Sequence, residues 1–92
     1  MNGIKINGKI SEGYKEGLKG RIYKLLPLRE EKGEWLKFLD TIITEMYGGL
    51  EDFESINYIR VLNKLNFLKF SSFYHFRRSI FECMDLIDHL DL

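Results

Sequence analysis

The sequence predicts an all-α protein, a compact three- to four-helix bundle with a short irregular or hairpin-like N-terminal arm, forming a single helical domain over residues 1–92. Apolar residues recur every three or four positions in four separate segments, which is the spacing of one face of an α-helix. Glycine, proline and serine residues stand between these segments and mark helix ends. A chain of 92 residues with 45% hydrophobic content can bury one core without disulfides.

Residues 1–11 form the expected arm. The dipeptide Asn7–Gly8 lies between two short runs that contain isoleucine and lysine, and Asn-Gly in this setting favours a hairpin turn. Strands this short are not stable alone. We therefore expect either a flexible arm or a short strand docked on the helices.

The first helix is predicted over about residues 12–26. Ser11 is suited to cap its N-terminus, and Pro27 is expected to end it, because proline lacks a backbone N–H. The apolar stripe consists of Tyr14, Leu18, Ile22 and Leu25. Three glycines share this segment, Gly13, Gly17 and Gly20, and each costs about 1 kcal/mol relative to alanine. The helix is therefore expected to be regular only from about Leu18, unless the glycines form a groove that another backbone approaches closely.

Two further helices are predicted over residues 34–47 and 53–69. The stripe of the second helix is Trp35, Leu39, Ile42 and Met46. Gly48 and Gly49 are expected to end it in the left-handed conformation. Glu51 or Asp52 is the expected cap of the third helix, whose stripe is Ile56, Ile59, Leu62, Leu65 and Leu68.

The last helix is predicted over residues 72–91, with Ser71 or Ser72 as its cap. Its stripe has steps of 3, 4, 3, 4 and 3 and consists of Phe73, Phe76, Ile80, Cys83, Ile87 and Leu90. Further apolar residues widen the stripe, so several neighbours must cover it. We expect this helix to be the central one.

Charge is sorted into blocks although the formal net charge is zero. Residues 1–29 carry 7 − 2 = +5, residues 30–54 carry 2 − 8 = −6, residues 55–79 carry +5, and residues 80–92 carry −4. In an antiparallel bundle, blocks of opposite sign can face one another and so help to fix the topology. The last helix also reverses the preference of the helix dipole, with Arg77 and Arg78 near its start and acidic residues in its second half. Basic residues elsewhere in the fold, or a partner with a basic patch, would compensate.

The residue inventory argues against an enzyme. Cys83 is the single cysteine and lies on an apolar stripe, while His75 and His89 stand about 21 Å apart along one helix. Asp85 and His89 have metal-ligand spacing, but a solvated acidic surface is the preferred interpretation, so no metal or cofactor is predicted. No apolar run is long enough to span a membrane and no signal peptide is evident, which predicts a cytoplasmic protein without a membrane partner.

Protein binding is the preferred function, nucleic-acid binding is the alternative, and a structural subunit with no separate partner site is a third possibility. Binding to another protein, with the chain alone or as a homodimer, would use exposed aromatic and acidic residues, the candidates being Tyr23, Trp35, Tyr47, Tyr58, Tyr74, Asp85 and Asp88. The alternative is nucleic-acid binding through a basic patch on the third and fourth helices, formed by Arg60, Lys64, Lys69, Arg77 and Arg78. Alanine and glutamine are absent, whereas residues with A/T-rich codons are plentiful. This composition predicts a low-GC bacterium or one of its phages or mobile elements, and a factor that regulates or inhibits a host protein.

Overall fold

Four antiparallel helices form an elongated bundle in the computed structural model, which describes residues 5–6, 9–31, 33–50 and 55–90. The helices are α1 (Glu12–Tyr23), α3 (Glu34–Gly48), α4 (Ile56–Phe67) and α5 (Phe73–Asp88). Two short helical turns accompany them, α2 (Leu25–Leu28) and η2 (Leu68–Phe70). The molecule, including the N-terminal arm, measures 41 × 20 × 19 Å. The all-α bundle predicted from the sequence is confirmed.

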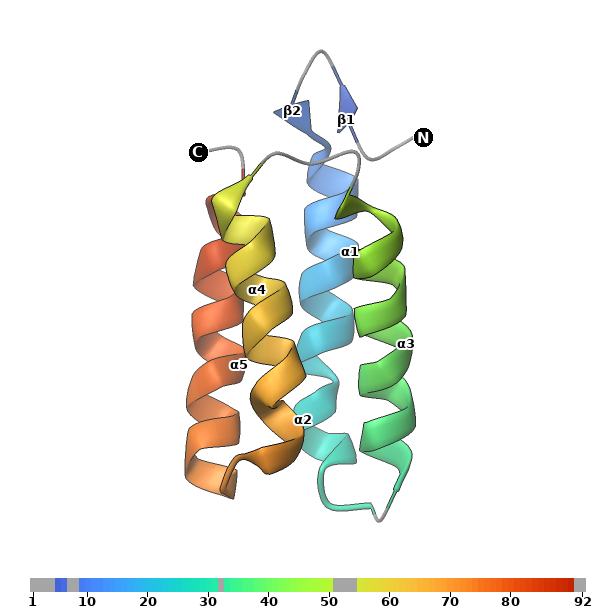
Figure 1. Ribbon diagram of the computed structural model, residues 1–92, viewed down its shortest axis with the longest axis vertical. Coiled ribbons are helices and arrows are strands. Elements are labelled where there is room, and N and C mark those ends of the chain that lie inside the picture. The colour runs from blue at the N-terminus through green and yellow to red at the C-terminus, as the bar shows by residue number, and fades with distance from the viewer. Residues whose placement is uncertain (1–4, 7–8, 32, 51–54, 91–92) are drawn as a thin grey trace.

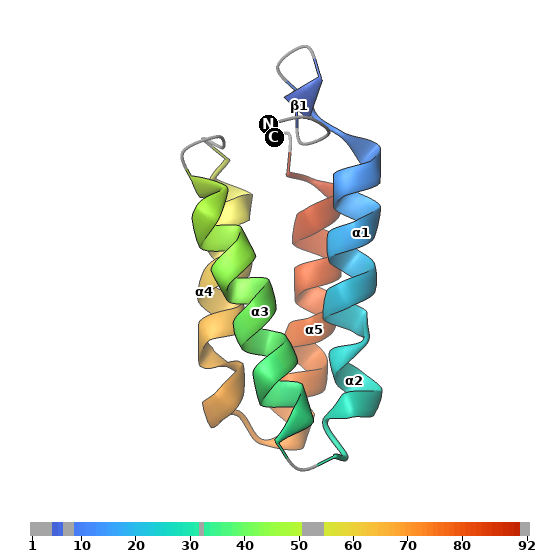
Figure 2. The same ribbon diagram turned by 90° about the vertical axis from the view of Figure 1, so that its right-hand side faces the viewer.

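Each helix runs antiparallel to the next along the chain, and the four surround one core (Figures 1 and 2). α5 packs against both α1 and α4, α4 packs against α3, and a smaller contact between α1 and α3 closes the ring. The core consists mainly of aliphatic side chains from all four helices, with Trp35, Tyr58 and Phe76 as its aromatic members. The predicted stripe of α5 is buried from Phe76 onward, whereas Phe73 in its first turn is 52% exposed.

The N-terminal arm contains a short hairpin, as the Asn-Gly signal indicates, and not the flexible arm or single docked strand that we expect from such short strands. Strand β1 (Lys5–Ile6) pairs antiparallel with β2 (Lys9–Ile10), so that Lys5 lies opposite Ile10 and Ile6 opposite Lys9. The predicted turn at residues 7–8 lies outside the described residues. Ile10 is 6% exposed and belongs to the core, so the second strand anchors the arm to the bundle.

The first helix is regular from Glu12, which corrects the expectation of irregular structure before Leu18. The Ser11 hydroxyl accepts a hydrogen bond from the Tyr14 N–H at 3.1 Å, and Leu18 and Ile22 are fully buried, so the cap and the core stabilise the helix despite its glycines. A Cβ added to any of the three glycines would meet no described atom within 4 Å. No close backbone approach of the described chain therefore explains them.

Pro27 does not end the first helix as predicted. The helix is interrupted at Lys24 instead, between α1 and α2, and Pro27 is the third residue of α2. Proline is tolerated there because the N–H groups of a first helical turn have no partner within the helix.

The ends of α3 also differ from the prediction. Gly33 precedes it with φ +83°, a left-handed conformation that glycine adopts readily. At the other end, Gly49 has φ −91° rather than the expected positive value, and its N–H bonds to the Met46 carbonyl at 3.1 Å. The last turn therefore tightens without a left-handed residue.

Serine residues cap the last two helices. Ser55 accepts a hydrogen bond from the Tyr58 N–H at 3.4 Å, and Ser72 accepts one from the His75 N–H at 3.3 Å. Ser55 thus replaces the predicted cap of α4, and residues 51 and 52 lie outside the described part of the chain. The predicted helix over 53–69 also ends as a 3₁₀ turn, because η2 follows α4 directly.

Ion pairs between the elements follow the charge blocks. Lys19 of α1 pairs with Asp88 of α5 at 2.6 Å, Lys64 of α4 pairs with Glu82 of α5 at 2.7 Å, and Lys69 of η2 pairs with Asp40 of α3 at 3.5 Å. Arg21 of α1 also pairs with Glu45 of α3. In the described part of the chain, every such pair joins a positive block to a negative one. The predicted facing of opposite blocks is confirmed.

Candidate interaction surface

Exposed aromatic side chains gather where α4 turns into α5. Phe67 is 68% exposed, Phe70 82%, Phe73 52% and Tyr74 69%, and we call these four residues the aromatic turn. Leu68 between them is fully buried and holds η2 on the core. Because Leu68 continues the α4 stripe, its neighbours Phe67 and Phe70 are directed outward. Phe73 stacks on the core ring of Phe76, with ring centroids 6.5 Å apart, whereas Phe67 and Phe70 belong neither to the core nor to the partly buried side chains packed against it.

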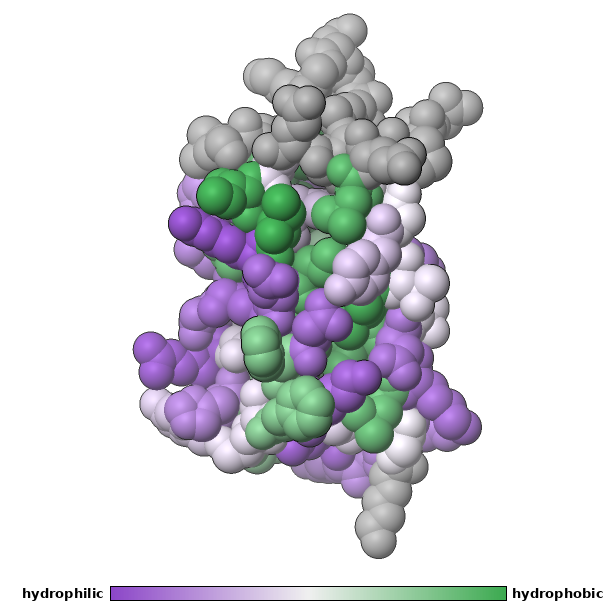
Figure 3. All heavy atoms as spheres, viewed as in Figure 1, coloured by the Kyte–Doolittle hydropathy of each residue, from purple (hydrophilic) through white to green (hydrophobic). Residues whose placement is uncertain are grey.

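Apolar side chains also lie at the opposite end of α4. Ile56 is 59% exposed and Ile59 46% exposed. Figure 3 shows hydrophobic side chains near both ends of α4, with hydrophilic side chains between them. The outward face of α4 thus has two apolar regions separated by charge.

Two of the predicted aromatic anchors belong to the core, which corrects the expectation for them. Trp35 is 9% exposed and packs edge-on against Phe76, with ring centroids 5.3 Å apart. Tyr58 is fully buried, and its hydroxyl donates a hydrogen bond of 2.6 Å to the Met46 carbonyl. A buried tyrosine needs such a partner for its polar atom. Neither ring is available to a partner protein.

The other three predicted aromatics are on the surface, but they lie on different elements. Tyr23 of α1 and Tyr47 of α3 are each 52% exposed. Tyr23 contacts Phe81 of α5 edge-on at 6.2 Å, and Tyr74 belongs to the aromatic turn. Sequence reasoning missed Phe67 and Phe70. The signal that could have identified them is their position beside Leu68, which ends the stripe of the third predicted helix.

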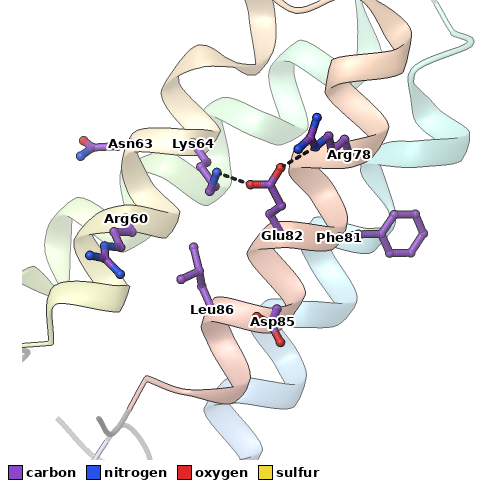
Figure 4. A pocket seen from close by; sticks show the side chains of 8 residues that line it. All are labelled: Arg60, Asn63, Lys64, Arg78, Phe81, Glu82, Asp85 and Leu86. Carbon is purple, nitrogen blue, oxygen red and sulfur yellow. Dashed lines mark hydrogen bonds and ion pairs between the residues drawn. The ribbon is translucent and has the colours of Figure 1, made fainter.

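A groove with a volume of about 790 Å³ runs between α4 and α5. It is lined by Arg60, Asn63, Lys64, Arg78, Phe81, Glu82, Asp85 and Leu86 (Figure 4). Glu82 lies between Lys64 at 2.7 Å and Arg78 at 3.3 Å. The hydrogen bond from Lys64 is the main reason why the pKa of Glu82 is lowered from its ordinary value.

The basic residues predicted for nucleic-acid binding are mostly engaged by carboxylates. Lys64 and Arg78 share Glu82, and Lys69 pairs with Asp40. Arg60 and Arg77 form no ion pair with the described residues, and the Arg77 guanidinium lies 5.9 Å from the Phe81 ring centroid. Tyr74, Arg77, Arg78 and Phe81 together line a smaller hollow of about 300 Å³. Of the five predicted cations, Arg60 and Arg77 therefore remain available for phosphates.

Of the two acidic residues predicted for binding near the C-terminal end of α5, Asp88 forms an ion pair within the described chain and Asp85 does not. Asp88 pairs with Lys19, and this hydrogen bond is the main cause of the raised pKa of Lys19. Asp85 is exposed and has no ion-pair partner among the described residues. A ring nitrogen of His89 lies 2.9 Å from the Asp85 carbonyl oxygen. In the described ranges, no group of three or more potential ligand side chains could hold a metal ion.

Cys83 is fully buried in the core. Burial raises the pKa of its thiol to about 12, so the thiol stays protonated at neutral pH. Since the thiolate is the nucleophilic form, Cys83 acts here as a small core residue.

The chain matches no protein-family model, no curated protein and no solved structure. Among the described helices, none is both long and apolar enough to cross a membrane. Function must therefore be inferred from the surface of the molecule itself.

Proposed function

We propose that this protein is a small non-catalytic module that binds another protein through its aromatic turn. The exposure of Phe67 and Phe70 carries the proposal, because neither ring contributes to the core and exposed aromatics supply much of the binding energy in protein interfaces. The neighbouring Arg77 and Arg78 would surround the apolar contact with polar groups that tolerate water at the rim.

The composition supports a biological setting for this binding. A chain without alanine or glutamine and rich in isoleucine, lysine, asparagine and phenylalanine suits a low-GC genome. The proposed setting is therefore the cytoplasm of a low-GC bacterium, where the protein acts as a phage or mobile-element factor that regulates or inhibits a host protein.

Capture of a partner from the lysate of a low-GC host, followed by calorimetry with the purified partner, tests this proposal. Replacing both Phe67 and Phe70 by serine should weaken the interaction roughly tenfold or more, since two interface rings are lost. The matched control replaces Ile56 and Ile59 by serine, because these residues are exposed at the other end of α4. Equal losses for both variants would contradict a site at the aromatic turn.

Nucleic-acid binding remains the second candidate. It is favoured by the hollow in which Tyr74 and Phe81 lie beside Arg77 and Arg78, since aromatic rings stack on bases and guanidinium groups pair with phosphates. Replacing both arginines by glutamate should then abolish a salt-dependent interaction with DNA or RNA. A preparation free of nucleic acid at low salt, with no binding to single-stranded DNA, would argue against this candidate.

A further inference from the structure

The outward face of α5 carries a stripe of aromatic and charged residues with Phe81 at its centre. Tyr74, Arg78, Phe81, Asp85 and Asp88 follow one another at steps of 4, 3, 4 and 3, so they form a single stripe opposite the buried one. Arg77 lies along the same stripe. All six residues are exposed, with Phe81 at 46%. We call them the outer stripe.

The charges of the outer stripe that lack a partner are placed symmetrically. Arg78 already pairs with Glu82, and Asp88 pairs with Lys19. Arg77 and Asp85 form no ion pair with any described residue. They have opposite signs and stand four residues before and four residues after Phe81, which corresponds to about 6 Å along the helix axis on each side.

The same two charges oppose the dipole of their own helix. Arg77 lies toward the positive N-terminal end of α5, and Asp85 lies toward its negative C-terminal end. In an antiparallel pair of helices, Arg77 would lie beside the negative C-terminal half of the neighbouring helix, and Asp85 would lie beside its positive N-terminal half. The dipole of the neighbouring helix would therefore favour both charges.

We propose that a second copy of this chain docks on the outer stripe, with the two α5 helices antiparallel about a twofold axis at Phe81. Residues placed at equal distances before and after Phe81 then face each other, so Arg77 lies opposite Asp85 of the partner subunit and Asp85 lies opposite Arg77 of the partner subunit. Packed helices have axes about 8–10 Å apart, a separation that these side chains can bridge. The two Phe81 rings occupy the centre of the contact.

The symmetry of the pattern identifies the occupant as a second copy. An isologous interface must be complementary to itself, so each charge on one side of the axis needs its opposite on the other side. Within the outer stripe, the two charges without an ion-pair partner among the described residues, Arg77 and Asp85, meet this requirement around a half-exposed aromatic residue, while Arg78 and Asp88 are neutralised by Glu82 and Lys19 of their own chain. The outer stripe shares Tyr74, Arg77 and Arg78 with the aromatic turn and its rim. Phe67 and Phe70 lie outside the stripe, so changes at these two rings separate this self-association from the proposed binding of another protein.

Sedimentation equilibrium of the full chain over a wide concentration range at low salt tests the dimer. Wild type should dimerise more weakly as salt rises. Arg77→Glu places two like-charge pairs in the interface, as does Asp85→Lys, and each change should raise the dissociation constant roughly tenfold or more.

An equimolar mixture of the two variants should recover dimerisation. The glutamate introduced in one subunit then faces the lysine introduced in the other, and the unchanged Arg77 of the second subunit faces the unchanged Asp85 of the first. Opposite charges therefore meet at both positions of the mixed dimer, whereas each variant alone brings like charges together.

Three controls separate this proposal from loss of folding and from the proposed function. Both variants change exposed residues, and their circular dichroism should match wild type. Arg60→Glu makes the same charge change at an exposed arginine of α4 and should leave the dissociation constant unchanged, as should the double serine variant at Phe67 and Phe70. A wild type that stays monomeric at every concentration overturns the proposal. A variant mixture that does not associate overturns the twofold geometry.

Discussion

Arg29 connects two loops at one end of the bundle. Its guanidinium carbon lies 4.6 Å from the ring centroids of both Trp35 and Phe76, and its Nη2 donates a hydrogen bond of 3.2 Å to the Ser71 carbonyl. Its Nη1 is buried without a hydrogen-bond partner in the described structure. The side chain thus ties the connection after α2 to the one before α5 through stacking.

Replacing Arg29 by lysine should lower the free energy of unfolding by about 1–2 kcal/mol, because an ammonium group cannot stack on both rings. Urea denaturation followed by circular dichroism measures the change. Arg60→Lys, at an exposed position, serves as the control and should be neutral. An Arg29→Lys midpoint equal to that of wild type would show that the stacking contributes nothing.

The role of Arg29 could not be predicted from the sequence, and the reason is physical. Its partners Trp35, Ser71 and Phe76 come from three different segments, and only the folded bundle brings them together. The burial of most stripe residues, by contrast, follows directly from helical spacing. The prediction of a surface role for Trp35 and Tyr58 is wrong because an aromatic residue can serve as an anchor or as a core residue. Spacing along one helix does not show which face a neighbour covers.

At the scale of the element, α1 is built with little intrinsic helix preference. Gly13, Gly17 and Gly20 are all exposed, and a Cβ would fit at each without contact to described atoms. The helix is therefore stabilised by its cap and by packing of Leu18 and Ile22, not by local propensity.

Gly13→Ala, Gly17→Ala and Gly20→Ala should each raise the free energy of unfolding by up to about 1 kcal/mol, and the triple variant by about 2–3 kcal/mol. Thermal and urea unfolding provide the measurement. Gly33→Ala is the contrasting control, because its φ of +83° makes the substitution unfavourable despite open space. A triple variant less stable than wild type would indicate that these glycines serve a contact made outside the described chain.

Helix positions are more predictable than helix ends. The four apolar stripes locate α1, α3, α4 and α5, and the sequence identifies Ser11 as the cap of α1 and limits the cap of α5 to Ser71 or Ser72. The break at Lys24 and the 3₁₀ turn of η2 do not follow from the sequence, because the last turn of a helix depends on how the following segment packs. For the same reason the sequence does not distinguish Ser55 from earlier capping residues.

At the scale of the whole molecule, the charge blocks are readable in the sequence and the ion pairs confirm their arrangement. The candidate interaction surface is only partly predictable. The sequence identifies Tyr74 and the adjacent arginines, but the tertiary packing of Leu68 decides that Phe67 and Phe70 face outward. Which cations remain unpaired also depends on neighbours from other helices, as the pair of Lys69 with Asp40 illustrates.

The stability that the contact between α4 and α5 contributes should depend on pH, because the Glu82 carboxylate takes part in it. Lys64 lowers the Glu82 pKa from the ordinary value of 4.5, so this carboxylate stabilises the fold above that pH, and the contribution disappears as pH falls through the folded pKa. Glu82→Gln should cost less than about 1 kcal/mol at neutral pH, because both side chains of the pair are partly exposed to solvent. Its stability should converge with that of wild type as pH falls below 4.5.

Urea unfolding of both proteins across this pH range provides the measurement. Glu30→Gln is the control, because Glu30 is exposed and makes no ion pair with the described residues. A stability difference between Glu82→Gln and wild type that does not change with pH would mean that the carboxylate charge is not the cause.

The packing of α1 against α5 has a consequence for synthesis. α1 leaves the ribosome well before α5, yet α5 is its main neighbour in the bundle. Until α5 emerges, Leu18 and Ile22 lack the surface that buries them, and a helix rich in glycine has little tendency to persist alone. The nascent chain therefore completes its bundle only after α5 has left the ribosome, and a ribosome stalled before α5 holds a segment open to chaperones and proteases.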